Sequence, residues 1–245
     1  MLSDQQLERY QAQLFLPEVD IEGQLQLLAK KVLVVGAGGL GNHLLPTLAG
    51  AGVGQILLYD PDVISLSNLP RQWLYRPADL GLPKVEVCAR FIGERFSDCR
   101  LWARQERFDE QSLAQLPWQP DLLLDCSDHL PTRLLLNDWA LKQGLPLVTA
   151  SAIGLQGQIL LHDPRQQAGC WRCLFSDVAD QPLACSQAGV LASVVQQVAA
   201  MQAQLALHQL LAWPQLPVNL WRYQGQLNQW RSLRVPLDPA CSAEH

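Results

Sequence analysis

The chain is poor in charge, and its charges do not gather into a basic cluster. Charged residues make up 17% of the 245 residues, and the net charge is −5. A nucleic-acid-binding surface needs concentrated lysine and arginine, so we expect no nucleic-acid partner. The N-terminal segment MLSDQQLERYQ lacks the positive start and apolar core of a signal peptide. With seven cysteines and no export signal, we expect a cytoplasmic protein whose thiols are reduced or bind metal.

A long segment of the C-terminal half has no charge at all. Positions 181–221 contain no Asp, Glu, Lys or Arg. Apolar residues recur there on or near one face of a helix expected from Gly189 to Trp213. Its length would allow a membrane span, but glutamines such as Gln196 and Gln202 interrupt the apolar run. We expect a buried or dimer-interface helix and no membrane span.

The segment from Lys31 to Asp60 reads KVLVVGAGGLGNHLLPTLAGAGVGQILLYD. A β-branched run, typical of a buried parallel strand, precedes glycines at G-x-G-x-x-G spacing, and a helical stretch, a second apolar run and an acid follow. The first glycine permits a tight turn, the second lets a phosphate approach the backbone, and the third lets helix pack on strand. This pattern predicts a nucleotide site, with Asp60 accepting hydrogen bonds from ribose hydroxyls. The expected binding glycines are Gly36, Gly38, Gly39 and Gly41.

Strands and helices alternate along the chain, with no internal repeat or low-complexity linker. The pattern predicts an α/β fold with a Rossmann-like, doubly wound and mostly parallel sheet, extended by antiparallel strands. Predicted strands cover 32–35, 55–59, 101–104, 122–125, 145–150, 158–162, 219–223 and 229–235. Predicted helices cover 3–14, 21–29, 84–96 and 132–143. A further helix follows the glycines, and Pro46 should kink it or end its first turns. The segment from Arg165 to Gln187 should be a long connection.

Motifs spread over nearly the whole chain resemble the ThiF/MoeB/HesA family of ubiquitin-activating-like adenylyltransferases. They are ERYQAQ, GAGGLG, AGAGVG, LYDPDVISLSNLPRQ, LPKVE, LLLDCSD, LVTASAIGLQGQ, CWRC and ACSQAGV. The tail YQGQLNQWRSL and the stretch GCWRCL are closer to ThiF, the thiamine-pathway member. The resemblance implies one domain over 1–245. Its nucleotide-binding half is at about 31–150, and a carrier, zinc-loop and dimerisation half is at about 151–245.

The activity that this resemblance implies is ATP- and Mg²⁺-dependent adenylylation of a small protein. The substrate would be the C-terminal Gly-Gly of a ubiquitin-like sulfur carrier, that of thiamine thiazole synthesis. Alternatives are the molybdopterin-synthase carrier adenylyltransferase and a catalytically weakened carrier-binding homologue. A homodimer and a sulfurtransferase or cysteine desulfurase partner are also implied. A nicotinamide-dependent oxidoreductase would share the glycines and Asp60, but it gives no reason for the charged residues described next.

Adenylylation brings a carboxylate against a triphosphate, so cations and metal must neutralise charge. No P-loop lysine follows the glycines, and Arg71 and Lys84, which follow strand-end loops, are the candidates. Each alone would more often be a solvated surface charge. The resemblance implies that Asn68 and Arg71 contact the phosphates and that Lys84 stabilises the reacting α-phosphoryl group. Asp62 is assigned to the same site, or it shapes the turn after Pro61.

Asp128 ends the motif DCSD after a predicted buried strand. A carboxylate at the carboxyl end of a strand suits Mg²⁺ and ATP phosphates, and the resemblance implies the same role. The alternative is a helix N-cap.

Cys185 lies in ACSQAGV, just before the long helix. A thiol near a helix N-terminus has a lowered pKa and is more nucleophilic. The resemblance implies that Cys185 takes part in sulfur transfer to the carrier or in conjugation with it. A buried structural thiol is the alternative.

Cys170 and Cys173 form C-W-R-C, which we expect in a loop rather than at the start of a helix, so zinc is favoured over a redox pair. The family completes a zinc site with a second C-x-x-C near the C-terminus. Here that position reads Asp238-Pro-Ala-Cys241. Cys170, Cys173 and Cys241 with Asp238 or His245 could bind Zn²⁺, and otherwise the thiols should be free.

Three departures from the family pattern bear on catalytic competence and not on the fold. The family's RYxRQ motif provides an arginine that reaches the partner subunit's ATP. Here Arg9 is retained, but the second arginine position is Ala12. Pro70 stands before Arg71 where glutamine is usual, and His129 follows Asp128 where asparagine is usual.

Overall fold

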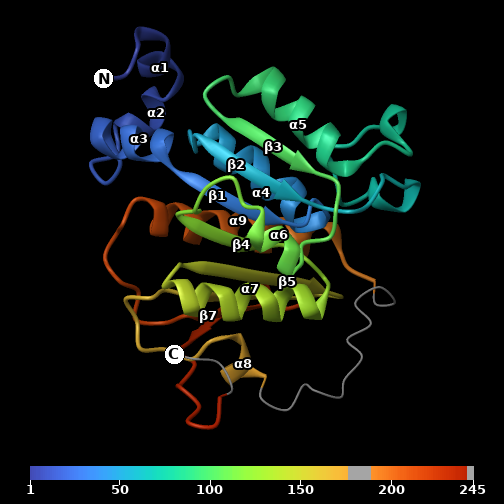
Figure 1. Ribbon diagram of the computed structural model, residues 1–245, viewed down its shortest axis with the longest axis vertical. Coiled ribbons are helices and arrows are strands. Elements are labelled where there is room, and N and C mark those ends of the chain that lie inside the picture. The colour runs from blue at the N-terminus through green and yellow to red at the C-terminus, as the bar shows by residue number, and fades with distance from the viewer. Residues whose placement is uncertain (176–188, 242–245) are drawn as a thin grey trace.

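A computed structural model describes residues 1–175 and 189–241 of the chain. Its strands form one eight-stranded sheet in the order β3-β2-β1-β4-β5-β6-β7-β8, with helices on both faces (Figure 1). Neighbours among the first five strands in this order are parallel, and β6, β7 and β8 pair antiparallel. The predicted doubly wound sheet with an antiparallel extension is confirmed.

All predicted strands are present, with some ends displaced by a few residues. The strands are β1 (Lys31–Val35), β2 (Gln55–Tyr59), β3 (Arg100–Arg104), β4 (Leu122–Asp125), β5 (Leu147–Ile153), β6 (Gln156–His162), β7 (Leu220–Gln224) and β8 (Gln229–Leu233). The α-helices are α1 (Asp4–Arg9), α2 (Gln11–Leu14), α3 (Asp20–Ala29), α4 (Gly39–Gly50), α5 (Lys84–Arg95), α6 (Glu110–Ala114), α7 (Leu130–Gln143), α8 (Trp171–Leu174) and α9 (Ala192–Leu210). Two short 3-10 helices are η1 (Leu66–Asn68) and η2 (Pro77–Asp79).

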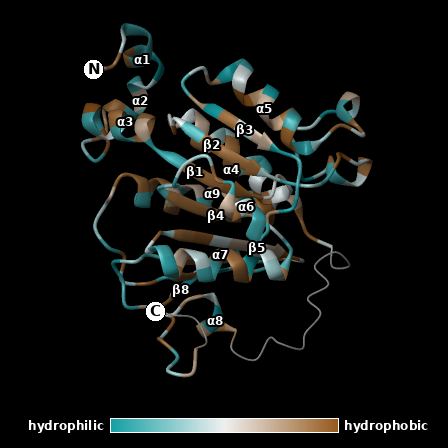
Figure 2. Cartoon of the chain, in the orientation of Figure 1, coloured by the Kyte–Doolittle hydropathy of each residue, from teal (hydrophilic) through white to brown (hydrophobic). Residues whose placement is uncertain are grey.

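The central strands consist mostly of apolar residues, as the colouring in Figure 2 shows, and apolar clusters lie on both faces of the sheet. Val34 of β1 belongs to the same buried cluster as Leu44 of α4 and Val198 of α9. The adjacent Leu33 belongs to a second cluster with Leu136 of α7. Because β1 is covered on both sides, its sequence is a continuous apolar run rather than an alternation.

The charge-free helix α9 packs within its own chain. It lies against α4, β4, β5 and β6, and its buried residues include Val194, Val198 and Leu205. Its exposed positions include Gln197 and Gln204. The predicted buried helix is therefore confirmed, and its apolar side is covered without a second subunit. None of the helices in the described ranges is both long and apolar enough to cross a membrane.

Two details of the helices differ from expectation. The single helix predicted over 3–14 is broken at Tyr10 into α1 and α2. Tyr10 is buried, and its hydroxyl donates to Asp98 at 3.0 Å, so a tertiary contact fixes the break. Helix α4 continues through Pro46 to Gly50, so the expectation that Pro46 ends its first turns is wrong, and the alternative of a kink stays a prediction. Its buried leucines on both sides of Pro46 stabilise the helix by packing.

Candidate functional site

A cavity of about 730 Å³ opens at the carboxyl ends of the parallel strands. It lies where β1 and β4 are neighbours and their following helices, α4 and α7, cover opposite faces of the sheet. This is the crevice in which doubly wound folds bind their ligands. Most of the predicted site residues line it, namely Gly36, Gly38, Gly39, Asp60, Asp62, Asn68, Arg71, Lys84 and Asp128. Gly41 is in α4, outside the lining.

The glycine turn has the geometry that its sequence predicts. Gly36 has a φ of +104°, and a Cβ there would lie 2.6 Å from the carbonyl oxygen of Cys126. A Cβ at Gly41 would overlap the carbonyl oxygen of Gly36, so the helix can approach the turn only with glycine at this position. At Gly38 the Cβ position is open, and a side chain 3.9 Å away is its nearest neighbour. An anion therefore has room beside Gly38, facing the N-terminal amides of α4.

Asp60 follows β2 and points its carboxylate at the glycine turn. One oxygen accepts a hydrogen bond from the Ala37 amide at 2.7 Å, and the other accepts one from the Asp62 amide at 2.8 Å. Burial raises the pKa of Asp60, and the nearby Lys84 ammonium opposes that shift. Each oxygen keeps a lone pair that can accept from a ribose hydroxyl, which suits the predicted role.

Two cations border the cavity on the side of β2. Lys84 is buried at the start of α5, and its Nζ lies 2.7 Å from Oδ2 of Asp62. Asp62 is largely exposed, so a phosphate oxygen could replace this carboxylate with little movement of the lysine. Arg71 Nη1 donates to the carbonyl of Ser67 at 2.8 Å, at the wall that also contains Asn68. The cavity thus has cations suited to phosphate without a P-loop lysine.

Asp128 presents an exposed carboxylate to the cavity from the loop after β4. The N-cap of α7 is the next residue, His129, whose Nδ1 accepts from the Thr132 amide. The interpretation of Asp128 as the helix cap is therefore wrong. A carboxylate without a capping role at the end of a strand fits a hard cation such as Mg²⁺.

Sequence reasoning missed a buried ion pair beneath this loop. Arg133 donates from Nε to Asp125 at 2.8 Å and from Nη2 to the carbonyls of Ser127 and Ala150, at 2.5 and 3.1 Å. Asp125 is fully buried and also accepts from the amide and hydroxyl of Ser127. The pair therefore joins the end of β4 and the middle of β5 to the loop that carries Asp128. A cation near the start of a helix opposes the helix dipole, and this was the available sequence signal.

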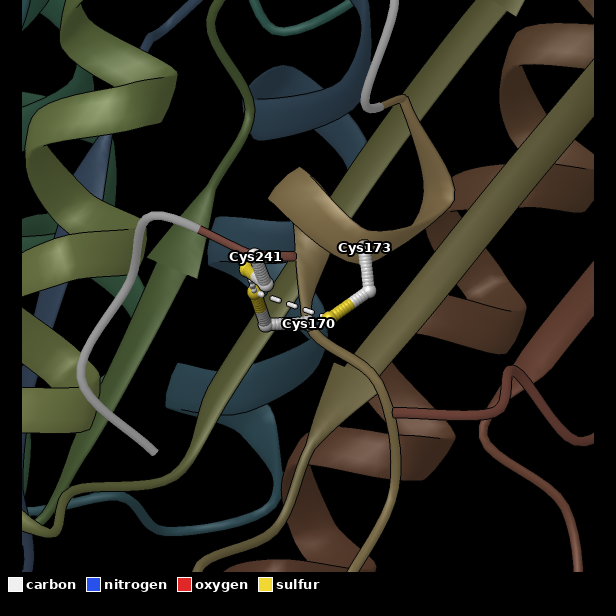
Figure 3. A group of neighbouring side chains, drawn as sticks. All are labelled: Cys170, Cys173 and Cys241. Atoms are coloured by element: carbon white, nitrogen blue, oxygen red, sulfur yellow. Dashed lines mark hydrogen bonds between the residues drawn. The ribbon is translucent and has the colours of Figure 1, made fainter. Parts of the chain in front are cut away.

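Three cysteines that are not part of the cavity lining meet between α8 and the C-terminal segment (Figure 3). Cys170 Sγ lies 3.9 Å from Cys173 Sγ and 3.8 Å from Cys241 Sγ. The predicted cluster is thus assembled, and its thiols suit Zn²⁺. Asp238 is not in this cluster, and its carboxylate accepts from the Ala240 amide instead. His245, the other proposed ligand, lies outside the described residues.

The C-W-R-C segment does not form the loop that we expected. Cys170 is the N-cap of the short helix α8. Burial raises the pKa of Cys170 to about 12, the opposite of the activated thiol in a redox pair. The observation that favours the metal interpretation is that three thiols lie within reach of one ion, and not the absence of a helix.

The other predicted residues are Cys185 and those of the N-terminal motif, Arg9 and Ala12. Cys185 lies outside the described residues. Arg9 is bound within its own chain, with its Nε 3.5 Å from Asp98 and its guanidinium donating to the Arg95 carbonyl and the Ser97 hydroxyl. Ala12 is exposed in α2.

Comparisons with known proteins agree with this geometry. Residues 10–243 match the ThiF family. The chain is 36% identical over 241 residues to the sulfur carrier protein ThiS adenylyltransferase of Escherichia coli, covering 98% of this chain and 96% of that protein. It is 36% identical over 242 residues to the molybdopterin-synthase adenylyltransferase of Salmonella typhimurium, covering 98% and 97%. The crystal structure of E. coli MccB with ATP has a TM-score of 0.78 at 25% identity, over 90% of this chain and 67% of that chain.

Proposed function

This chain belongs to the ThiF family, and from that membership we propose that it adenylylates the C-terminal glycine of a ubiquitin-like sulfur carrier protein. Its relatives over nearly the whole length are named adenylyltransferases, so the predicted enzyme class is confirmed. The names of these two relatives refer to different carrier proteins. We place the carrier in thiamine thiazole synthesis, following the motifs GCWRCL and YQGQLNQWRSL.

The observation that carries this proposal is the charge arrangement around the glycine turn. Arg71, Lys84 and Asp128 come from three separate segments and all face one cavity at the head of α4. Cations could also bind the pyrophosphate of a nicotinamide dinucleotide, but that ligand gives no reason for a free carboxylate suited to Mg²⁺ beside them. A triphosphate with Mg²⁺ uses all three.

The chemistry follows from these positions. A carrier carboxylate oxygen attacks the α-phosphorus of ATP, the bond to the bridging oxygen of the β-phosphate breaks, and acyl-adenylate and pyrophosphate form. Lys84 would bind the α-phosphoryl oxygens, and Arg71 would bind the departing phosphates. Asp128 would hold Mg²⁺, which neutralises triphosphate charge when bound. No proton is transferred, so the site needs no general base.

ATP–pyrophosphate exchange with purified carriers tests this function. Labelled pyrophosphate should enter ATP only when a carrier ending in Gly-Gly is present, and fastest with the thiazole-pathway carrier. Faster exchange with the molybdopterin-synthase carrier would favour that alternative. Carrier binding without exchange would favour a weakened homologue, for which Ala12 is the supporting observation. Tight NAD binding without ATP binding would contradict the proposal.

We place the sulfur-delivery step in the second half of the chain, at about 151–245. Cys185 would take part in sulfur transfer to the carrier or in conjugation with it. In conjugation, its thiolate would attack the acyl carbon of the acyl-adenylate and AMP would leave. A sulfurtransferase or cysteine desulfurase would be the sulfur donor. Adenylylation uses no enzyme nucleophile, so Cys185→Ser should keep pyrophosphate exchange and lose thiocarboxylate formation. Equal loss in both assays would mean that the thiol is structural.

A further inference from the structure

One polar side chain in the cavity wall has no partner in the free protein. Gln72 is 2% exposed and lines the cavity, and its Oε1 is sealed from solvent without a hydrogen bond. Within the described ranges the other end of the carboxamide also has no hydrogen-bond partner. A buried amide without partners is destabilising, so its presence at a ligand cavity calls for a functional explanation.

The surrounding contacts hold Gln72 at the head of α4. The carbonyl of the preceding Arg71 accepts a hydrogen bond from His43 Nε2 at 3.2 Å. Oδ1 of Asn42 accepts one from the Leu74 amide at 2.8 Å. His43 and Asn42 both belong to α4. The residues that they bind, Arg71 and Leu74, lie on either side of Gln72 in the sequence. The carboxamide is therefore positioned by the helix whose N-terminus faces the cavity.

The amide nitrogen of Gln72, Nε2, lies beside the unoccupied Cβ position of Gly38 in the glycine turn. Nε2 of Gln72 is 3.9 Å from the position that a Cβ at Gly38 would occupy, and it is the nearest atom there apart from those of Gly38 and its chain neighbours. Helix α4 begins at Gly39, and Gly38, its N-cap, offers no side chain to its first amides. Arg71 Cδ lies 3.9 Å from the Cβ position of Gly39. An anion beside Gly38 would thus meet helix amides, a guanidinium and a carboxamide together.

We propose that Gln72 is a phosphate-binding residue whose Nε2 donates to an oxygen of the ATP triphosphate seated beside Gly38. The inference rests on the proposed use of ATP. Phosphate oxygens only accept hydrogen bonds, and Nε2 is the donor that faces them. Gln72 adds a neutral donor next to the charged Arg71, at a turn that has no P-loop lysine. The bound nucleotide would give Nε2 the acceptor that the free protein lacks, whereas Oε1, itself an acceptor, gains no partner from phosphate.

Two variants of Gln72 test this role by calorimetric titration with MgATP and with adenosine. Gln72→Met keeps the length of the side chain but has no donor, so the Kd for MgATP should rise about tenfold or more. The Kd for adenosine should not change, because the nucleoside has no phosphate. Gln72→Glu keeps the shape and places a negative charge against the triphosphate, so it should weaken MgATP binding further.

Thermal unfolding of the free protein separates this role from a structural one. Removing an unpaired buried oxygen should leave the Tm of Gln72→Met equal to or above that of the parent. Gln197→Glu, on the exposed side of α9, adds the same charge outside the cavity and should bind MgATP like the parent. Unchanged MgATP affinity in Gln72→Met would overturn the inference. A lower Tm with equal losses for both ligands would also overturn it. A parent that binds no MgATP would instead contradict the proposed function itself.

Discussion

The side chains at this cavity divide between those that face a ligand and those that fix their position. Lys84, Arg71 and Asp128 line the cavity, and we propose that they bind the nucleotide or its metal. Asp125 and Arg133 join the strands and loop behind them. Substitutions in the first group should affect chemistry with little effect on stability, whereas those in the second should affect both.

Asp128→Asn belongs to the first group. The substitution removes the charge that we assign to Mg²⁺, so carrier-dependent pyrophosphate exchange should fall at least about a hundredfold. The free energy of unfolding should not change, because the carboxylate is exposed and does not cap α7. Asp4→Asn, at an exposed aspartate of α1, is the matched control and should exchange like the parent. An Asp128→Asn protein with full exchange would remove Asp128 from the metal site.

Asp125→Asn belongs to the second group. It leaves the Arg133 guanidinium, whose side chain is 12% exposed, without its anionic partner. Breaking such a buried pair should lower the free energy of unfolding by about 3 kcal/mol, measured by urea titration. Glu94→Gln breaks the exposed Glu94–Arg95 pair and should cost less than about 1 kcal/mol. The double variant Asp125→Asn, Arg133→Met should lose less than the sum of its parts. Strictly additive losses would show that the pair is not coupled.

Among the elements, those set by local sequence were predictable. The glycine turn is one, because the backbone at Gly36 and the packing at Gly41 exclude other residues at a spacing visible in the chain. The break at Tyr10 was not predictable, because it depends on Asp98, which is remote in sequence. The role of Arg133 and the proposed role of Gln72 also depend on neighbours that only the fold brings together. Sequence motifs thus identified most of the candidate residues that line the cavity, but not those whose role depends on remote contacts.

The short helix α8 holds part of the cysteine cluster, and zinc content tests its role. We expect about one zinc per chain by elemental analysis, and its loss in Cys170→Ser, because Cys170 lies between the other two thiols. Chelation should lower the Tm of the parent, since α8 and the C-terminal segment would lose their crosslink. Cys99→Ala, at a buried thiol outside the cluster, should keep its zinc. Zinc-free parent protein with reactive Cys173 and Cys241 thiols would support the free-thiol alternative.

For the whole molecule, the case for a dimer shifts from α9 to the N-terminal segment. The apolar face of α9 is covered by its own sheet, so the absence of charge there does not require a partner. Phe15, Leu16 and Ile21 are instead exposed around α2 and α3, next to Ala12. We expect a homodimer that buries these residues. Light scattering at micromolar concentration should show a dimer for the parent and a monomer for Phe15→Asp. A monomeric parent would contradict this prediction.

Ala12 tests whether that dimer completes the active site. By the family resemblance, an arginine at this position reaches the partner subunit's ATP. Arg9 does not replace it, because Arg9 is bound to Asp98 and to the end of α5 in its own chain. Loss of one contact to the transition-state charge costs about 3 kcal/mol, roughly a hundredfold in rate. Ala12→Arg should therefore speed exchange by up to about that factor at saturating ATP and carrier, with little change in carrier affinity.

Two further experiments test whether the effect depends on the position of the added arginine and which subunit's site it serves. Gln11→Arg adds the same charge at the neighbouring exposed residue but directs it elsewhere on the helix, so this variant should exchange like the parent.

In mixed dimers, a subunit carrying Ala12→Arg and Lys84→Ala has a disabled site of its own but can still donate an arginine. Mixing it with the parent should accelerate the parent's site if the arginine acts across the interface. Acceleration by Ala12→Arg alone, absent from the mixture, would place the arginine in its own subunit's cavity. An Ala12→Arg enzyme no faster than the parent would mean that another cation, from this chain or the carrier, already balances the phosphate charge.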